Sequence, residues 1–225
     1  MYPICLKLEG VKCLVVGGGR VGERKARKLV EQKAIVYLVS RDATGWFYDA
    51  IKNGQVVWVA KEYSEECLLD DISLVFAATS DDELNSRIVR DALKKGLWCN
   101  SATNPYEGNF IVPASFSRGK LTIAVSTDGA SPALAALIKD AIAEEFNARW
   151  GEALECLDVL RKAIQTVTAR SDDNLQIFRE IAGVVFNSLR ERTDIETMKN
   201  RIDLILSLNF SLEELEKLRQ VLEKC

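Results

Sequence analysis

The sequence predicts an α/β protein with a Rossmann-type parallel sheet, then a short segment that pairs with another chain, then an all-helical C-terminal domain. Three observations support this prediction. Between Val11 and Val112, short apolar runs alternate with helical stretches, as parallel strands joined by crossover helices do. The first apolar run leads into a glycine-rich turn that opens a helix. From Trp150 onward, apolar residues recur at helical spacing.

We expect parallel strands in the first part of the chain wherever a short apolar run is bounded by turn residues. The expected strands are Lys12–Val16, Ile35–Val39, Val56–Ala60, Leu74–Ala77, Trp98–Asn100 and Phe110–Val112. The expected helices are Val21–Gln32, Thr44–Asn53, Ser64–Leu69 and Asp82–Lys95. The last helix starts favourably, because the polar run Ser80–Glu83 can cap its first turn and places negative charge at the positive end of the helix dipole. Successive βα units with right-handed crossovers give a Rossmann-type sheet.

The pattern changes after Pro113. A β-like run, Lys120–Ser126, is followed by a polar turn and an Ala/Leu-rich helix from Ala133 to about Phe146. This segment is too short to hold a core of its own, so we expect it to pair with another chain. The helices that follow end with one that Ser211 caps, with Glu214 at the capping-box position. We therefore expect three domains, at residues 1–113, 114–147 and 148–225.

The composition excludes several classes of function. A net charge of -3 over 225 residues gives no global attraction to nucleic acid or to an anionic membrane. The N-terminus carries charge too early for an export signal, and no apolar run approaches a membrane span, so we expect a cytoplasmic protein whose six scattered cysteines are reduced. Cys225, at the end of a polar helix, is the thiol expected to be exposed. The absence of histidine removes the commonest general base and metal ligand, and no metal site is expected.

The glycine turn has the form of a dinucleotide pyrophosphate site. Gly17 permits the tight turn, Gly19 lets the backbone approach a phosphate, and Gly22 lets the new helix pack closely on the sheet. The free N–H groups and the helix dipole then face the anion. A close-packed strand–helix turn without a ligand is the alternative.

The end of the second expected strand bears on the choice of dinucleotide. Rossmann units that bind NAD usually place an acidic residue there to take the ribose hydroxyls. This chain has Ser40, Arg41 and Asp42 at that place. Asp42 can serve NAD, whereas Arg41 can equally lie against the adenine or hold a 2′-phosphate. A solvated loop without a ligand is the alternative. Spacing alone therefore leaves NAD and NADP open.

Several motifs, taken together and in order, resemble the precorrin-2 dehydrogenases, which include the N-terminal module of siroheme synthases. The resemblance covers about Met1 to Phe146, and the helical last third is similar only in type and placement. The matching segments are Tyr2-Pro3 with Leu8-Glu9-Gly10, the turn at 17–22, Ala77–Asn85, Cys99–Ala102, Gly108–Ala114 and Leu121–Ala135.

The resemblance implies oxidation of precorrin-2 to sirohydrochlorin with NAD as the hydride acceptor, for siroheme or a related tetrapyrrole. It also implies a homodimer in which the region after the Rossmann unit is a small swapped dimerisation segment. The residues expected to bind the cofactor, besides Gly17, Gly19, Gly22 and Ser40, are Arg20 and Val21 at the pyrophosphate, Arg41 and Asp42 at the ribose, and Thr79, Asn85 and Asn100 at strand ends.

One departure from the family pattern concerns the catalytic carboxylate. Where the family has an aspartate after the Asn100 segment, this chain has Thr103 or Asn104, both much poorer proton acceptors. Asn104 can still orient a substrate. Asp128, in a turn where the family has glycine, is a candidate replacement, although a turn by itself favours Asp. Glu107 is a third candidate, but as a loop residue it is more often simply solvated.

The implied substrate is a polycarboxylate, so basic side chains should surround it. Arg118 and Lys120 are candidates for this role, with Ser126 and Thr127 of the later turn. The cluster Arg24, Lys25, Arg27 and Lys28 fits either a substrate site or a solvated helix face. Iron insertion, which some family members perform, is doubtful without histidine and the family acid.

Two functions compete with the dehydrogenase. The first is a catalytically weakened carrier that binds NAD and the tetrapyrrole and delivers the macrocycle to a partner. The second is a ligand-sensing regulatory Rossmann module, against which the segments at 110–114 and 126–132 argue.

Overall fold

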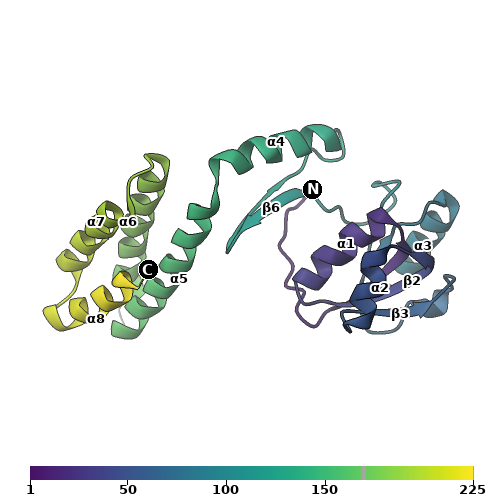
Figure 1. The fold of residues 1–225 in the computed structure, drawn as a ribbon, viewed down its shortest axis with the longest axis horizontal. Coiled ribbons are helices and arrows are strands. Elements are labelled where there is room, and N and C mark those ends of the chain that lie inside the picture. The colour runs from purple at the N-terminus through teal and green to yellow at the C-terminus, as the bar shows by residue number, and fades with distance from the viewer. Residues whose placement is uncertain (169–170, 225) are drawn as a thin grey trace. The chain divides into compact units, whose positions relative to one another are not determined.

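The computed structural model describes residues 1–168 and 171–224. The chain divides into two compact units, Met1–Val112 and Pro113–Cys225, and Figure 1 labels their helices and strands. The boundary between the units falls one residue from the expected end of the first domain. The further division expected after residue 147 stays a prediction; helix α4 (Pro132–Glu145) ends there and α5 (Ala148–Val167) begins.

The first unit is built on a parallel sheet, which confirms the predicted fold class. Its strand order is β3-β2-β1-β4-β5, and each neighbouring pair is parallel. The strands are β1 (Lys12–Gly18), β2 (Ile35–Ala43), β3 (Val56–Ala60), β4 (Ile72–Ala77) and β5 (Trp98–Ser101). The chain order reverses between β1 and β4, and in sheets of this kind the ligand binds at the carboxyl edge of that point.

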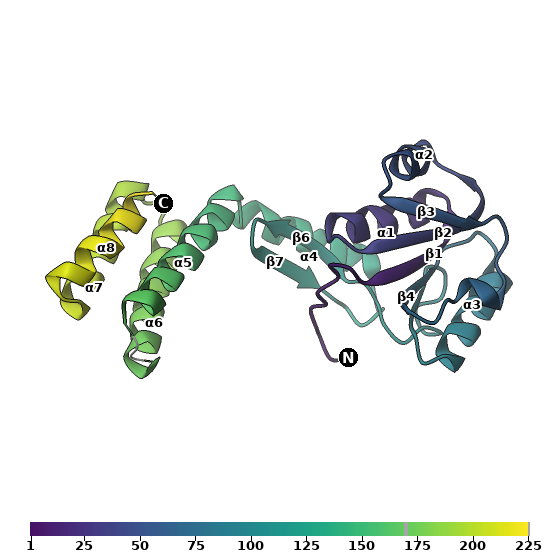
Figure 2. The ribbon, with the colours of Figure 1, turned by 90° about the horizontal axis from the view of Figure 1, so that it is seen from below.

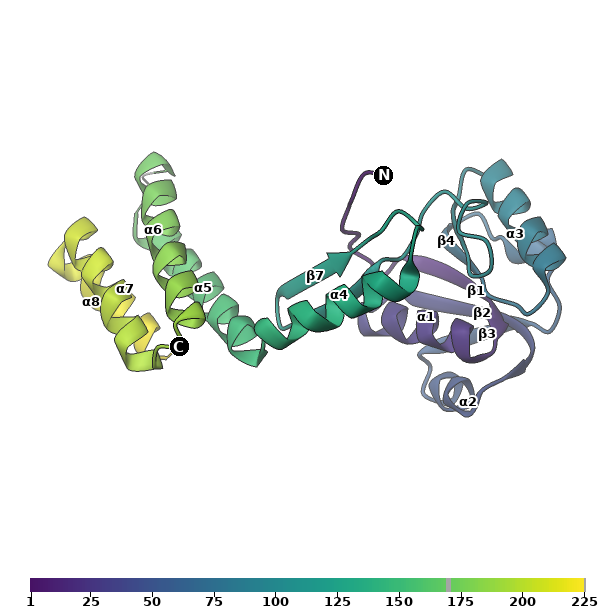
Figure 3. The same cartoon turned by 90° about the horizontal axis from the view of Figure 1, so that it is seen from above.

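Helices cover both faces of this sheet. On one face, α1 (Arg20–Glu31) and α2 (Gly45–Lys52) bury Ala26, Leu29 and Phe47 against β1 and β2. On the other face, α3 (Asp82–Lys94) packs Ile88 and Val89 against β1 and β4. Figures 2 and 3 show the sheet between these two layers. The apolar runs of the strands are buried on both faces, as expected of a parallel sheet with helices on each side.

Two elements differ from the prediction. The run Phe110–Val112 is not a strand. The Phe110 ring instead packs on Phe76 and Trp98, and the Phe110 backbone carbonyl accepts a hydrogen bond from the Asn100 side chain (Nδ2 to O, 3.1 Å). The strand comes afterwards, as β6 (Ala114–Arg118). The segment predicted to be the helix Ser64–Leu69 forms only a single 3₁₀ turn, Glu65–Cys67.

The second unit combines a hairpin with helices. Strand β6 pairs in antiparallel register with β7 (Leu121–Val125), and α4 packs against both strands (Figure 1). Helices α5, α6 (Ser171–Arg190), α7 (Ile195–Asn209) and α8 (Leu212–Glu223) share a core that includes Leu160, Ile202 and Leu218. The expected capping box of Ser211 and Glu214 is present at the start of α8.

The cysteines differ partly from expectation. Cys5, Cys13, Cys67 and Cys99 are free thiols, and of these Cys5 is exposed. Cys156 is disulfide-bonded on α5, a helix packed against α8, so the expectation of a reduced thiol is wrong there. Cys225 lies outside the described residues. Within the described part of the chain, no helix is both long and apolar enough to span a membrane.

Helix α5 lies unusually close to the turn of the hairpin. A Cβ on Gly151 would stand 2.6 Å from the carbonyl oxygen of Arg118 and 3.1 Å from the Gly119 nitrogen. Contacts this short leave no room for a methyl group, so Gly151 fixes how closely the helix and the hairpin approach. Gly183, in the middle of α6, has nothing within 4 Å of the corresponding position.

The two helical glycines give opposite predictions when each is replaced by alanine. Gly183→Ala should raise the free energy of unfolding by roughly 0.5–1 kcal/mol, because it removes only the entropic cost of a helical glycine. Gly151→Ala should lower that free energy by about 1–3 kcal/mol, because overpacking against the Arg118 carbonyl outweighs the gain. Denaturant unfolding followed by far-UV circular dichroism measures both. Equal stabilisation by the two changes would contradict the close approach.

Candidate functional site

The glycine turn brings β1, α1 and β4 into backbone contact. Gly17 has a φ of +112°, and a Cβ there would stand 2.3 Å from the Ala78 carbonyl oxygen at the end of β4. A Cβ on Gly22 would stand 1.9 Å from the Gly17 carbonyl oxygen. At Gly19, by contrast, a Cβ would meet nothing within 4 Å. The open side of the turn therefore lies at Gly19, where the first N–H groups of α1 have no helical partner, and a dinucleotide pyrophosphate fits this cradle.

The end of β2 is tied to the same turn. The Gly18 N–H donates to the Ser40 hydroxyl (2.8 Å), which in turn donates to the Asp42 carbonyl oxygen (2.6 Å). Strand β2 continues through this segment to Ala43, beyond its predicted end. Ser40 therefore positions the two backbones relative to each other, and its hydroxyl is already committed.

The two charged residues beside Ser40 differ in their surroundings. Arg41 donates to the Glu62 carboxylate (3.0 Å) in an exposed ion pair. Asp42 is exposed, and no hydrogen bond or ion pair of its carboxylate is present among the described residues. An unengaged carboxylate at this strand end can accept hydrogen bonds from ribose hydroxyls. The geometry thus favours Asp42 over Arg41 as the ribose contact.

Asn85 is a buried bridge between two loops at the carboxyl edge. It is fully buried on α3, and its Oδ1 accepts hydrogen bonds from the Thr79 N–H (3.1 Å) and hydroxyl (2.8 Å). Its Nδ2 donates to the Thr79 carbonyl (3.1 Å) and to the Thr103 hydroxyl (3.3 Å). Asn85 joins the loop after β4 to the loop after β5. It therefore sets the positions of Thr79 and Thr103.

The loop after β5 contains a second hydrogen-bonded cluster. The Asn104 Oδ1 accepts from the Tyr106 N–H (3.2 Å), and its Nδ2 donates to the Glu107 carboxylate (3.1 Å). The Ser86 hydroxyl of α3 approaches both carboxylate oxygens of Glu107, at 3.0 and 2.8 Å. The amide of Asn104 is thus used within its own loop, and Glu107 is held rather than freely solvated.

Asn100 also acts inside the first unit. It is 4% exposed at the end of β5 and donates to the Phe110 carbonyl. Next to it, burial raises the pKa of the Cys99 thiol to about 12, so this thiol remains protonated and is a poor nucleophile at neutral pH.

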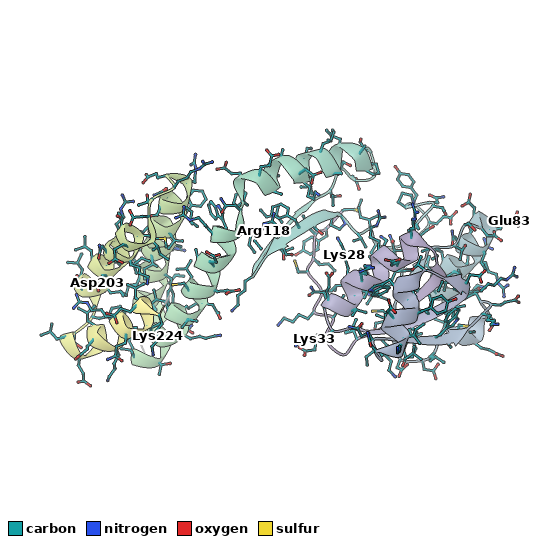
Figure 4. The ribbon with its side chains drawn as sticks, in the orientation of Figure 1. Lys28, Lys33, Glu83, Arg118, Asp203 and Lys224 are labelled. Atoms are coloured by element: carbon teal, nitrogen blue, oxygen red, sulfur yellow. The ribbon has the colours of Figure 1, made fainter. Side chains whose placement is uncertain are left out.

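The predicted basic residues of the second unit are engaged within that unit. The Arg118 guanidinium, labelled in Figure 4, lies over the Phe116 ring at 5.2 Å from its centroid. Lys120 forms an ion pair with Asp158 of α5. Hydrogen bonds from Lys120 and Lys162 lower the pKa of Asp158 to about 2. The pairing of Lys120 anchors the hairpin to α5.

The turn between β7 and α4 is held by its own hydroxyls. The Thr127 hydroxyl accepts from the Ser131 N–H (3.1 Å) and donates to the Ser131 carbonyl (3.0 Å), while Ser131 caps α4. The Asp128 N–H donates to the Ser126 hydroxyl (3.3 Å). Asp128 has a φ of +54°, in the left-handed region that Asp tolerates better than most residues. This conformation favours a turn role for Asp128.

The basic cluster on α1 is only partly a solvated face. Arg27 pairs with Glu23 (2.7 Å) and lies over the Trp46 ring, 4.7 Å from its centroid. Lys25 turns inward over Phe76, and burial, with Arg24 and Lys28 nearby, lowers its pKa to about 8. Arg20 and Val21 are exposed at the start of the helix, beside Gly19. Among the described residues, no group of three or more Cys, Asp or Glu side chains is placed to hold a metal ion.

Comparison with known proteins agrees with this geometry. Residues 4–114 match a family model described as putative NAD(P)-binding, and residues 118–145 match one described as the central domain of sirohaem biosynthesis proteins. The precorrin-2 dehydrogenase of Priestia megaterium is 30% identical over 181 residues, which cover 80% of this chain and 89% of that protein. The chain belongs to the precorrin-2 dehydrogenase family. A solved structure of SirC, a precorrin-2 dehydrogenase, matches with a TM-score of 0.74 and 26% identity over the whole of both chains.

The longer relatives include this family's module as one part. Siroheme synthase 2 of Yersinia enterocolitica serotype O:8 / biotype 1B is 30% identical over 180 residues. The matched region covers 80% of this chain but only 38% of that protein. This precorrin-2 dehydrogenase family member thus spans little more than a third of the siroheme synthase.

Sequence reasoning did not identify two residues that support the site through hydrogen bonds. Ser86, which contacts Glu107, lies on α3, 21 positions earlier in the chain. Trp58 on β3 donates to the Ser40 carbonyl (3.1 Å) and so supports the end of β2. The sequence shows only that Ser86 and Trp58 carry hydrogen-bond donors within a predicted helix and a predicted strand. It does not identify their partners, which are distant in sequence.

Two alanine substitutions should separate ligand contact from packing in this family member. Gly19→Ala should leave the melting temperature unchanged, because its Cβ meets open space, but should weaken NAD binding by about tenfold or more, since the methyl occupies the phosphate approach. Gly22→Ala should lower the free energy of unfolding by roughly 3 kcal/mol, because it overpacks against the Gly17 carbonyl. Calorimetric NAD titration and thermal melting measure the two effects. Unchanged NAD affinity in Gly19→Ala would remove the pyrophosphate from this turn.

Proposed function

We propose that the chain catalyses NAD-dependent oxidation of precorrin-2 to sirohydrochlorin. The observation that carries the proposal is the open glycine cradle at Gly19, within a chain that matches a precorrin-2 dehydrogenase over 89% of that relative. The full-length likeness to SirC supports the same reaction. We also propose a cytoplasmic location, which the free thiols of Cys5, Cys13, Cys67 and Cys99 favour and the disulfide at Cys156 opposes.

The residues around the cradle would hold the dinucleotide. The turn from Gly17 to Gly22 and the first N–H groups of α1 would bind the pyrophosphate, with Arg20 and Val21 beside it. Asp42 would accept the ribose hydroxyls, which favours NAD over NADP, because a 2′-phosphate would face its negative charge. When bound, NAD+ supplies a hydride acceptor for the tetrapyrrole.

The chain's own contribution to the reaction is alignment of two reactants. Asn85 fixes the loops that carry Thr79 and Thr103, so the walls at the carboxyl edge are set before a ligand arrives. Holding the reacting atoms in place can supply a large part of the rate enhancement. Arg118, Lys120, Ser126 and Thr127 remain the proposed contacts for substrate carboxylates, and Asn104, Thr103 and Asp128 remain proposed groups near the reacting ring.

The direct test is incubation of the purified protein with precorrin-2 and NAD+ under anaerobic conditions. We expect NADH and sirohydrochlorin to form in equal amounts, and the absorbance of each product measures its formation. The same preparation tests the alternative function of a carrier, which the replacement of the family acid by Thr103 or Asn104 favours. Binding of the tetrapyrrole without any NADH would support the carrier and overturn the dehydrogenase.

We further propose that the protein is a homodimer that pairs through the hairpin and α4. Helix α4 buries only Ala135 well, whereas Leu134 and Leu137 are 50% and 66% exposed. No residue of β6 or β7 is buried, although α4 packs against both strands. A second copy that covers this apolar face would resolve both features.

A charge on this face should dissociate the dimer. Leu137→Lys should shift the sedimentation coefficient to that of a monomer at micromolar concentration, because a lysine would be buried without a partner. Leu208→Lys is the matched control, since Leu208 is 78% exposed on α7. We expect the control to sediment as the wild type does. A monomeric wild type, or a dimeric Leu137→Lys variant, would contradict this interface.

A further inference from the structure

The loop that follows β5 lies on the side of the sheet where the reacting ring of a dinucleotide would stand. The strand order places the crossover point between β1 and β4, and the glycine turn after β1 takes the pyrophosphate. Asp42, on the β2 side, fits the adenosine end. The other half of the dinucleotide then extends over the carboxyl ends of β4 and β5. Residues 102–109 form the loop at the end of β5.

Glu107 is the one acidic residue of this loop, and its carboxylate is fixed in place. The Ser86 hydroxyl shares its proton between the two carboxylate oxygens (3.0 and 2.8 Å), and the Asn104 amide donates to Oε1 (3.1 Å). The Glu107 N–H also donates to the Asn104 carbonyl (3.3 Å), which closes the turn. A carboxylate has about four lone-pair sites, so these donors leave acceptor capacity unused. Glu107 is partly exposed, so that capacity faces solvent or a ligand.

The other polar groups of the loop are less suited to accept a proton. The Asn104 Oδ1 already accepts from the Tyr106 N–H. The Thr103 hydroxyl accepts from Asn85. A neutral amide and a neutral hydroxyl are in any case far weaker bases than a carboxylate. Both side chains instead act on the shape of the loop, and Asn104 acts directly on Glu107.

We propose that Glu107 accepts the proton that precorrin-2 loses on oxidation, with Ser86 and Asn104 as its positioning residues. This inference rests on the proposed dehydrogenase function. In the step, the macrocycle loses one hydrogen with two electrons to NAD+ and a second hydrogen as a proton, from a pyrrole-type N–H or an adjacent carbon, to the Glu107 carboxylate. NAD+ becomes NADH, a new double bond forms in the macrocycle, and the carboxyl proton passes to water.

The first test is Glu107→Gln, which keeps the size of the side chain and an oxygen that can accept a hydrogen bond. We expect kcat to fall by about 100-fold or more, the loss typical of a removed general base, while the dissociation constant of NAD and the melting temperature stay those of the wild type. Glu83→Gln is the matched control, because Glu83, labelled in Figure 4, is exposed in the first turn of α3, and no hydrogen bond or ion pair of its carboxylate is present among the described residues. It should leave kcat unchanged.

The positioning role has its own measurement. Ser86→Ala leaves the Glu107 carboxylate without the hydroxyl that holds both of its oxygens, so kcat should fall, by less than in Glu107→Gln, while the KM for precorrin-2 and the melting temperature stay those of the wild type. Ser86→Thr restores the hydroxyl and should restore kcat. A purely structural role for Ser86 would lower the melting temperature together with kcat.

A binding experiment without NAD tests the same carboxylate independently of turnover. Sirohydrochlorin retains N–H groups that can donate to a carboxylate, so Glu107→Gln should weaken its binding by about fivefold, whereas Glu83→Gln should bind it as the wild type does. A wild type that forms no NADH overturns the proposed function, and this titration still decides whether Glu107 contacts the tetrapyrrole. Unchanged kcat and unchanged binding in Glu107→Gln, or a loss in Asp128→Asn in place of Glu107→Gln, would overturn the assignment of Glu107.

Discussion

The arrangement of the first unit depends on the close crossing of backbone segments at Gly17 and Gly22, where a side-chain methyl group would not fit. Helix α1 leaves β1 against the Gly17 carbonyl, and Gly17 itself lies against the end of β4. Strand β1, helix α1 and the residue after β4 therefore approach so closely that a Cβ would clash, which fixes where α1 begins and hence where its free N–H groups point. The same crossing leaves one side open at Gly19. Gly17 and Gly22 are thus densely packed, whereas Gly19 between them faces open space.

Around this crossing, the polar side chains divide into those that build the edge and those left available for a ligand. Asn85, Asn100 and Ser40 are used inside the protein. Ser40 joins β2 to the turn after β1, Asn85 joins the loops after β4 and β5, and Asn100 joins β5 to the stretch that follows it. Asp42 and Glu107 retain acceptor capacity. These hydrogen bonds hold the edge of the sheet in one arrangement, and fixed positions of this kind are the condition under which positioning lowers a barrier.

The sequence allowed prediction of those features that depend on local chemistry. Strand β3 has its predicted limits, Val56–Ala60, because polar and glycine residues bound a short apolar run, and the packing roles of Gly17 and Gly22 followed from their places in the turn. Phe110–Val112 has the same apolar character, yet it packs across the sheet face, since periodicity in three residues cannot separate a strand from a covering segment. The hydrogen bond from Ser86 to Glu107 joins positions 21 apart, and only the tertiary fold brings them together.

The buried thiols of the first unit can report when that unit unfolds. Cys13 and Cys99 are 0% exposed on β1 and β5, and burial raises their pKa to about 11 and about 12. A thiol-specific reagent needs the thiolate, so it can modify these cysteines only when the sheet separates. The rate at which Cys13 and Cys99 are labelled therefore measures the unfolding rate of the dinucleotide-binding unit alone. The exposed Cys5 reacts without unfolding and provides the reference for the start of the reaction.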